Sequence, residues 1–384
     1  MPWEEKSVME QRKEFVMLAV QEGSNIRELC RRFQVGKTTA YKWLDRYKKL
    51  GDAGLEDQSR KPLNSPDRSI SQVETNIVKA REKHPAWGAR KLKRWLEDSG
   101  CVDLPCASTV HAILQRHGKI SALDSADHQP WKRFEHAAPN DLWQMDFKGH
   151  FAMDTGRCHP LTVLDDHSRY VTCLGALGSE SYEATLARLI ETFRRYGMPY
   201  RMTMDNGSPW GEPGRYTRFE LRLMELGIRV SHSRPYHPQT QGKDERFHRT
   251  LKAEVLQGNV FKDLAHTQHV FDQWLPVYNQ ERPHDALQLQ TPASRYTSSP
   301  RAYPEKISAF EYDTGDEVRK VQDGGEFHYL GDIYHIGRAF HGEKIALRKT
   351  LDERARQVYF GIHHVANIAL NEKTVSIVKH GKNA

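Results

Sequence analysis

Cysteine is scarce in this chain of 384 residues and follows no pairing pattern. The five cysteines are scattered and odd in number, which predicts reduced thiols and excludes the disulfide framework of a small secreted domain. Cys101 and Cys106 lie near His111 and His117 and loosely imitate a zinc site. The four residues between Cys106 and His111 are far fewer than the roughly 12 of a zinc finger, so we expect no structural zinc.

Long apolar runs are also lacking. No stretch of 18 or more apolar residues occurs, so the sequence predicts no transmembrane helix. The first residues do not show the basic-then-apolar order of a signal peptide. Hydrophobic residues make up 38% of the chain, which at this length is enough for two to four folded domains. We therefore expect a cytoplasmic protein without a membrane partner.

Acidic residues are in deficit only near the N-terminus. The formal net charge is +7, and almost all of this excess falls within residues 1–137, while residues 138–300 are balanced. A basic N-terminal third is where contacts with phosphate are most expected. Because the excess is small, ordinary solubilisation is the alternative explanation.

The N-terminal segment has the pattern of three short helices, at about 8–22, 26–33 and 37–49. A short helix, a glycine-containing turn and a second helix form the layout of a helix-turn-helix. Side chains at the start and along one face of the third helix are candidate DNA contacts: Lys37, Thr38, Thr39, Tyr41, Lys42 and Arg46. A small bundle with a solvated basic face is the alternative.

A second helical module follows, with helices expected at 71–84, 88–97 and 107–117. It is similar in layout to the first, with Ser108 and Thr109 as candidate DNA contacts. A purely structural role is the alternative for this module.

Three carboxylates stand out in the middle of the chain. Asp146 lies in an alternating segment (142–147) that predicts a strand, and Asp205 ends a second strand because Asn206-Gly207 is a strong turn signal. Glu245 opens a helical stretch after a loop rich in proline, glycine and glutamine. If the three converge, they supply oxygen ligands for a divalent metal.

The helix that carries Glu245 has two distinct faces. Apolar residues recur every four positions from Phe247 to Val255 and must face a core. Glu245, Arg249 and Lys252 lie together on the opposite side, where a metal ligand and phosphate-binding cations would be neighbours. The alternative is a solvated face with an ordinary i,i+4 ion pair.

From residue 138 the pattern predicts a mixed α/β sheet: three antiparallel strands, then alternating helices and strands. Asp165 and Asp166 fall in an expected turn between strands and are assigned a structural role. Short alternating segments after residue 300 predict a small β-barrel.

The expected domains are a helix-turn-helix domain (1–55), a linker (56–68), a second helix-turn-helix-like domain (69–120), a connector (121–137), an α/β core (138–300) and a C-terminal β domain (301–384).

Five motifs occur in order between about residues 140 and 290. They are W-x-x-D-F at Asp146, D-N-G at Asp205, H-P-x-T-x-G-x-x-E-R from His237 to Arg246, a lysine seven residues after the glutamate (Lys252), and Y-N-x-x-R-P-H from Tyr278 to His284. In this combination the chain resembles a bacterial insertion-sequence DDE transposase with a catalytic core of the retroviral-integrase type. The helix-turn-helix N-terminus fits the same family, whereas the zinc module of retroviral integrases is absent from the sequence.

One departure concerns the third acid. The 39 residues between Asp205 and Glu245 exceed the usual interval of the family, and the excess falls in the loop 209–215. Asp244 is adjacent to Glu245 but points about 100° away on a helix. We therefore assign Glu245, not Asp244, as the third acid.

The resemblance implies a ribonuclease-H-like core and a two-metal mechanism. Asp146, Asp205 and Glu245 would be the catalytic acids and would hold two Mg²⁺ ions, for which Mn²⁺ substitutes. Arg249 and Lys252 would contact DNA phosphate. Residues assigned to active-site support or DNA contact, with a structural role as the alternative, are Asn206, His237, Asn279 and Arg282.

The implied activity is that of a polynucleotidyl transferase, which cleaves the ends of a mobile element and joins their 3′-OH groups to target DNA. Its partners would be double-stranded DNA, as terminal inverted repeats and as target, and at least a second copy of the chain. The location would be the bacterial cytoplasm, on the nucleoid when DNA is bound. The alternatives are a metal-dependent DNA nuclease and a catalytically inactive DNA-binding regulator.

Overall fold

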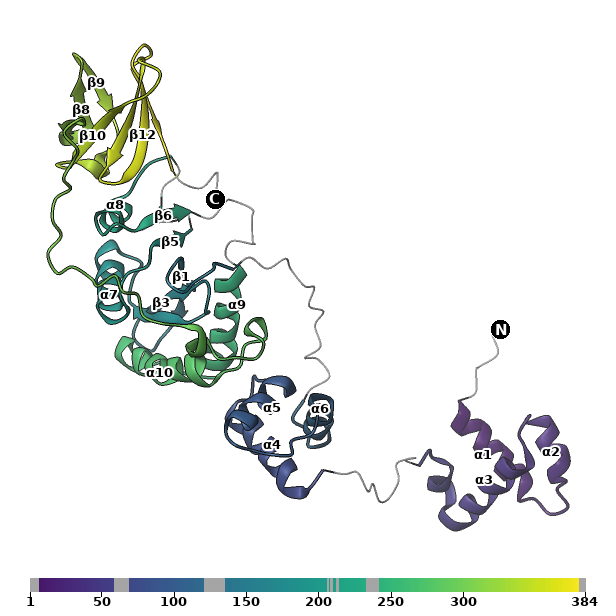
Figure 1. Ribbon diagram of the computed structural model, residues 1–384. Helices are drawn as coiled ribbons and strands as arrows, with labels where there is room; N and C mark the ends of the chain where they lie inside the picture. Colours follow the sequence, from purple (N-terminus) through teal and green to yellow (C-terminus); the bar gives the residue numbers. More distant parts are fainter. Residues whose placement is uncertain are drawn as a thin grey trace. The chain divides into compact units, whose positions relative to one another are not determined.

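The computed structural model describes residues 7–58, 69–120, 135–205, 207, 210–211, 214–232 and 242–379. The chain divides into two compact units, residues 1–68 and 69–384 (Figure 1). None of the helices in the described ranges is long and apolar enough to cross a membrane.

The first unit is helical. Its elements are α1 (Val8–Ala19), α2 (Ile26–Arg32), α3 (Lys37–Leu50) and the 3₁₀ turn η1 (Gly51–Leu55). Ser7 caps α1 in a reciprocal capping box with Glu10, which satisfies two backbone N–H groups that the helix leaves open. The core packs Phe15 and Val16 of α1 against Trp43 of α3. The predicted helices are confirmed, although α1 ends at Ala19, earlier than expected.

The second unit begins with three more helices, α4 (Ser71–Lys83), α5 (Ala89–Asp98) and α6 (Ala107–Arg116), close to the predicted limits. Their small core is built from Ile77, Leu92, Val110 and Leu114, all buried. Val277, far along the chain, also packs against this cluster. The helical module therefore contacts the α/β part of the same unit.

A mixed sheet forms the centre of the second unit. The strands are β1 (Trp143–Phe147), β2 (Phe151–Ala152), β3 (Arg157–Asp165), β4 (Val171–Leu177), β5 (Arg201–Met204) and β6 (Arg229–His232). β3 pairs antiparallel with both β1 and β4, whereas β5 pairs parallel with β1 and with β6. The predicted order of antiparallel strands followed by alternating helices and strands is confirmed.

Helices cover both faces of this sheet (Figure 1). On one side lie α7 (Tyr182–Tyr196) and α8 (Arg218–Glu225), and on the other lie α9 (Gly242–Leu251) and α10 (Leu264–Pro276). The inward residues of β1 and β5, such as Trp143 and Met202, pack against α7 and α8. Leu164 and Val171 on β3 and β4 pack against α9 and α10. Two separate apolar layers thus hold the sheet from both sides.

The apolar stripe predicted for α9 is confirmed, because Phe247, Leu251 and Val255 are all buried. Beyond Leu251 the helix continues as a π-helix, η3 (Lys252–Leu256). Likewise α10 runs into a second π-helix, η4 (Val277–Glu281). The 3₁₀ turns η5 (Asp285–Leu287) and η6 (Pro292–Arg295) follow. π-helical turns are rare in proteins and occur often at functional sites.

The C-terminal part is a β structure. Its strands are β7 (Glu317–Lys320), β8 (Glu326–Tyr329), β9 (Asp332–His335), β10 (Lys344–Lys349), β11 (Ala355–Phe360), β12 (His363–Ala369) and β13 (Thr374–Ile377). The larger sheet has the order β13-β12-β11-β10-β7, and β8 and β9 form a separate hairpin. Within the described residues its edge strands β13 and β7 do not pair with each other, so the predicted barrel is not confirmed. Tyr216, just before α8, contacts Phe340 edge to face and joins this region to the core.

Gly197 ends α7 and provides a test of the packing there. Its φ is +75°, and a Cβ atom at this position would meet the carbonyl oxygen of Ser299. We expect Gly197→Ala to lower the free energy of unfolding by about 2–3 kcal/mol, since it adds a clash to left-handed backbone strain. Gly156→Ala is the control, because its φ is +88° but the space around it is open. We expect it to lower the free energy of unfolding, measured by chemical denaturation, by about 1 kcal/mol. Equal losses for the two variants would contradict the packing argument.

Candidate active site

Two of the predicted carboxylates belong to neighbouring strands, because Asp146 lies in β1 and Asp205 directly follows β5. β1 and β5 are paired in parallel, with Trp143 opposite Met202 and Gln144 opposite Thr203. Continued by two residues, this register sets Asp146 beside Asp205, on strands that lie about 4.8 Å apart. Burial, followed by the charge of Asp205, raises the pKa of Asp146 to about 7. The structure therefore brings these two acids together.

Asp205 is held in a defined orientation. Its Oδ1 accepts a hydrogen bond from the backbone N–H of Gly207 at 2.9 Å and another from the indole N–H of Trp210. Trp210 is buried and stacks on Phe147, with ring centroids 4.8 Å apart. A large aromatic pair thus fixes this carboxylate beside the end of β1.

The helix α9 presents its two adjacent acids differently. Glu245 is exposed, on the same side as the exposed Arg249 and Lys252. Asp244 is only 1% exposed, and its Oδ1 has no hydrogen-bond partner. Burial raises the pKa of Asp244 well above its ordinary value, and the charge of Asp146 raises it further. In the described part of the chain, no three metal-ligating side chains converge, so the third predicted ligand is not brought to the pair.

His248 is a residue of this site that the sequence analysis missed. Its Nε2 is 2.9 Å from Oγ1 of Thr162, the cross-strand neighbour of Asp146, and that hydroxyl donates to the Asp146 carbonyl at 2.9 Å. The His248 Nδ1 atom is 3.9 Å from Oδ2 of Asp146. Burial lowers the pKa of His248 to about 4, so the imidazole is neutral at pH 7. The available signal was its position one helical turn after Glu245.

The two acids at the end of β3 and in the turn that follows have structural contacts, as expected. Asp165 accepts hydrogen bonds from the backbone N–H of Asn140 at 2.7 Å and of Ser168 at 2.8 Å. Asp166 is buried and forms an ion pair with Lys243, at the beginning of α9. This pair fastens the start of α9 to the β3–β4 turn, close to the carboxylate site.

Two residues assigned to active-site support have structural contacts. The buried side-chain amide of Asn279 binds the backbone of Val171 on β4, accepting at 2.9 Å and donating at 3.0 Å. Arg282 forms a buried ion pair with Glu254 at 2.8 Å. Asn206 and His237, the other two, lie outside the described residues.

The candidate DNA contacts of the first unit lie along α3. Lys37, Thr38, Thr39, Tyr41 and Lys42 are exposed. Arg46 is already engaged, because its guanidinium donates to the Glu56 carbonyl at 2.6 Å and lies over the Trp43 ring. DNA contact by these residues stays a prediction.

In the second helical module, Ser108 and Thr109 lie at the first turn of α6. Ser108 is exposed and Thr109 is half-buried. Both hydroxyls are within 3.0–3.2 Å of the sulfur of Cys106. Their predicted contact with DNA is likewise untested by the fold.

The chemistry of the Asp146–Asp205 pair fits a divalent cation. Carboxylate oxygens are the preferred ligands of Mg²⁺, and two carboxylates at close range repel each other unless a cation or a proton lies between them. Burial is the main cause of the raised pKa of Asp146, and the charge of Asp205 raises it further, in line with this repulsion. Asp146 and Asp205 could therefore hold the ion, with Glu245 as the third candidate.

Models of known protein families match separate parts of the chain: the helical N-terminal part, the α/β core and the C-terminal β part. Two models of the integrase core domain match residues 136–238 and 226–292, which include all three predicted acids. A helix-turn-helix domain matches 11–62, a homeodomain-like domain matches 39–114, and the C-terminal domain of IS481 family transposases matches 316–376. In these matches the chain is similar to the insertion-sequence transposases with an integrase core.

Individual relatives are distant. A Geobacillus stearothermophilus protein described as a transposase for insertion sequence element IS5376 is 24% identical over 52% of this chain and 51% of its own length. An uncharacterized 39.2 kDa protein of insertion element IS476 from Xanthomonas euvesicatoria is 25% identical over 63% of this chain and 69% of its own. The chain thus spans about half the length of the first relative.

One solved structure is also only distantly similar to this chain in sequence. A chain in the simian T-cell lymphotropic virus intasome, bound to PP2A regulatory subunit B56 gamma, is 15% identical, covering 79% of this chain and 96% of that chain. Its TM-score of 0.36 is too low to define a shared arrangement of domains.

Proposed function

We propose that this chain is a DNA transposase that binds the ends of its element, cleaves them and joins their 3′-OH groups to target DNA. The observation that carries the proposal is the proximity of Asp146, in β1, to Asp205, at the end of the adjacent parallel strand β5. Both lie within a match to the integrase core domain. Hydrolysis of DNA without joining needs the same acids, so product analysis separates the two activities.

Each residue of the site has a role that follows from its place. Asp146, Asp205 and Glu245 are proposed to hold Mg²⁺ in a ribonuclease-H-like core. When bound, the metal would supply a nucleophile and stabilise the leaving oxygen in phosphoryl transfer. Trp210 orients Asp205 through its indole N–H. On the exposed face of α9, Arg249 beside Glu245 and Lys252 at the start of η3 would hold the DNA phosphates.

Buried groups support these acids. His248 and Thr162 connect α9 to the β1–β3 ladder at Asp146. Because His248 is neutral, it adds no charge that would compete with a cation. We infer that this connection keeps α9 at a fixed distance from the strand carboxylates, as a preorganised site requires.

DNA recognition is assigned to the helical modules. The exposed cations and hydroxyls of α3 would lie in the major groove, as in other helix-turn-helix domains. An element has two ends, so we propose that at least two copies of the chain act together.

The test uses purified protein, Mg²⁺ and labelled DNA fragments that flank its own gene. Joined products are expected from the unaltered chain and not from Asp205→Asn. Asp272→Asn, which alters an exposed aspartate on α10, is the matched control and should retain joining. Cleavage without joining would favour the nuclease. Specific binding with no cleavage by any of the proteins would favour a catalytically inactive regulator.

A further inference from the structure

The second helical module is attached to the core by a buried carboxylate. Glu254 in η3 is 8% exposed, and its Oε1 accepts hydrogen bonds from the indole N–H of Trp87 at 3.1 Å and from Arg282 at 2.8 Å. Its Oε2 accepts another from the indole N–H of Trp274 at 3.1 Å. Trp87 precedes α5, whereas the other three residues belong to the core. We refer to these four residues as the Glu254 hub.

Ion pairs surround this attachment. Arg90 and Lys91 of α5 lie 3.6 Å and 3.7 Å from the two oxygens of Asp285 in η5. Burial lowers the pKa of Lys91 to about 8, with a further lowering by Arg282. The Glu254 hub and these pairs hold α5 in a defined position against the core segment 277–290.

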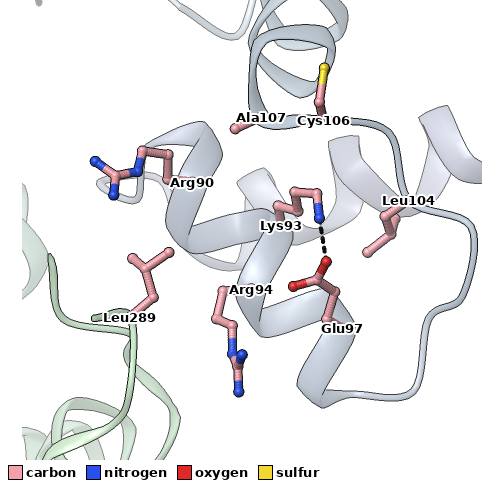
Figure 2. A pocket seen from close by; sticks show the side chains of 8 residues that line it. All are labelled: Arg90, Lys93, Arg94, Glu97, Leu104, Cys106, Ala107 and Leu289. Atoms are coloured by element: carbon pink, nitrogen blue, oxygen red, sulfur yellow. Dashed lines mark hydrogen bonds and ion pairs between the residues drawn. The ribbon is translucent and has the colours of Figure 1, made fainter. Parts of the chain in front are cut away.

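A basic pocket opens beside this attachment. It has a volume of about 490 Å³ and is lined by Arg90, Lys93, Arg94 and Glu97 of α5, together with Leu104, Cys106 and Leu289. Figure 2 shows that Leu289 reaches it from the core, while Leu104 and Cys106 come from the connection between α5 and α6. The pocket is therefore shared by the helical module and the core.

The core side of the pocket has unusual backbone. Gln288 and Leu289 both have positive φ, +56° and +63°, although neither is glycine. The strained segment is closed by hydrogen bonds of His284 N–H to the Gln290 carbonyl at 3.0 Å and of Leu289 N–H to the His284 carbonyl at 2.9 Å. Such strain persists where the surroundings fix it, and it often marks a functional site. Here it presents Leu289 to the basic face of α5.

We propose that this pocket binds the sugar–phosphate backbone of duplex DNA. Arginine and lysine bind phosphate oxygens, and the apolar Leu104, Ala107 and Leu289 match the apolar faces of deoxyribose. Two of the cations are paired within α5, Lys93 with Glu97 and Arg94 with Asp98, but exposed i,i+4 pairs contribute only a few tenths of a kcal/mol and exchange readily.

The proposal deepens the proposed function, on which its choice of DNA rests. A backbone contact at the junction would give DNA that is read by α6 a fixed path towards the core. The pocket carries no base-reading role, since backbone contacts position a duplex without specifying its sequence.

The first test measures DNA binding in the absence of metal. Labelled duplex from the flanks of the gene is titrated at several salt concentrations with the unaltered chain and with Arg90→Ala/Arg94→Ala. The slope of log K against log salt should fall in magnitude by about 2, because each lost phosphate contact removes about 0.9. A random duplex of equal length should lose affinity to a similar degree.

Two control variants test whether an effect comes from the pocket itself, from a general loss of positive charge, or from a weaker contact between the helical module and the core. Lys79→Ala/Lys119→Ala removes two cations of the same module that do not line the pocket, and should keep the slope. Asp285→Asn removes the docking partner of Arg90 and keeps the cation, so the slope should again be unchanged. An unchanged slope for Arg90→Ala/Arg94→Ala, or an equal loss in the Lys79/Lys119 control, would overturn the proposal.

The second test uses the unaltered chain, so folding of a variant plays no part. Cys106 is exposed at the pocket, and hydrogen bonds from Ser108 and Thr109 lower the pKa of its thiol to about 6. A thiolate of this kind reacts readily with iodoacetamide, whereas Cys30, Cys158 and Cys173 are buried. Saturating duplex should slow alkylation of Cys106 at least five-fold, with Cys106→Ser identifying the signal. An unchanged rate of Cys106 alkylation would overturn the proposal.

Both tests avoid catalysis. If the unaltered chain joins no DNA with Mg²⁺ but the slope and the alkylation respond as expected, the proposed function fails and the pocket stands. If joining occurs but neither the slope nor the alkylation rate responds, the pocket proposal is wrong and the proposed function is retained.

Discussion

Glu245→Gln is expected to abolish DNA joining, by at least about 10³-fold, whereas Asp244→Asn retains joining within about ten-fold of the unaltered chain. The loss for Glu245→Gln corresponds to about 4 kcal/mol of transition-state stabilisation, which is the scale that a catalytic metal provides. The two acids are adjacent in sequence, so this pair of variants decides which one completes the site.

The different expectations follow from the surroundings of the two side chains. Asp244 is buried beside Asp146 without a partner for its Oδ1, and burial raises its pKa well above the ordinary value, which favours the neutral acid. An asparagine has the same shape and is neutral, so the change is small. Glu245 is exposed on the face that carries Arg249, where a metal and DNA can reach it.

The measurement is the initial rate of joined product with Mg²⁺, compared with DNA affinity in the absence of metal. Both variants should bind DNA as the unaltered chain does, since neither loses a cation. Inactivity of Asp244→Asn together with activity of Glu245→Gln would show that Asp244, not Glu245, is the third acid.

Local patterns in the sequence were sufficient for much of the fold. Alternation around Asp146 and the turn signal after Asp205 predicted two strands, and the structure places them side by side. The apolar stripe from Phe247 to Val255 predicted the buried face of α9. These signals are local, because burial of one face sets a period of two or of 3.6 residues.

What the sequence did not predict depended on contacts between distant segments. Short alternating segments after residue 300 indicated strands but could not tell an open sheet from a closed barrel, since closure depends on pairing of β7 with β13. His248 is connected to Asp146 through the hydroxyl of Thr162, which lies 86 positions away in the sequence. Asn279 and Arg282 were candidates for support of the active site, and the structure gives both of them contacts that hold the fold together.

Glu254 was given no role from the sequence, because its partner Trp87 is 167 positions away. We expect Glu254→Ala to lower the free energy of unfolding of its unit by about 3–5 kcal/mol, since it leaves the buried charge of Arg282 unpaired and two indole N–H groups without an acceptor. Glu254→Gln should have a smaller effect, because an amide oxygen can still accept a hydrogen bond.

Urea unfolding followed by tryptophan fluorescence suits this test, because Trp87 and Trp274 both contact the altered side chain. With a slope of about 2–3 kcal/mol per molar urea, the midpoint should fall by about 1–2.5 M. Asp285→Ala is the control: its carboxylate is 41% exposed, so its ion pairs contribute about 1 kcal/mol or less. If the two variants unfold at the same urea concentration, the Glu254 hub does not hold the helical module to the core. In that case the basic pocket loses the fixed geometry on which a continuous DNA path depends.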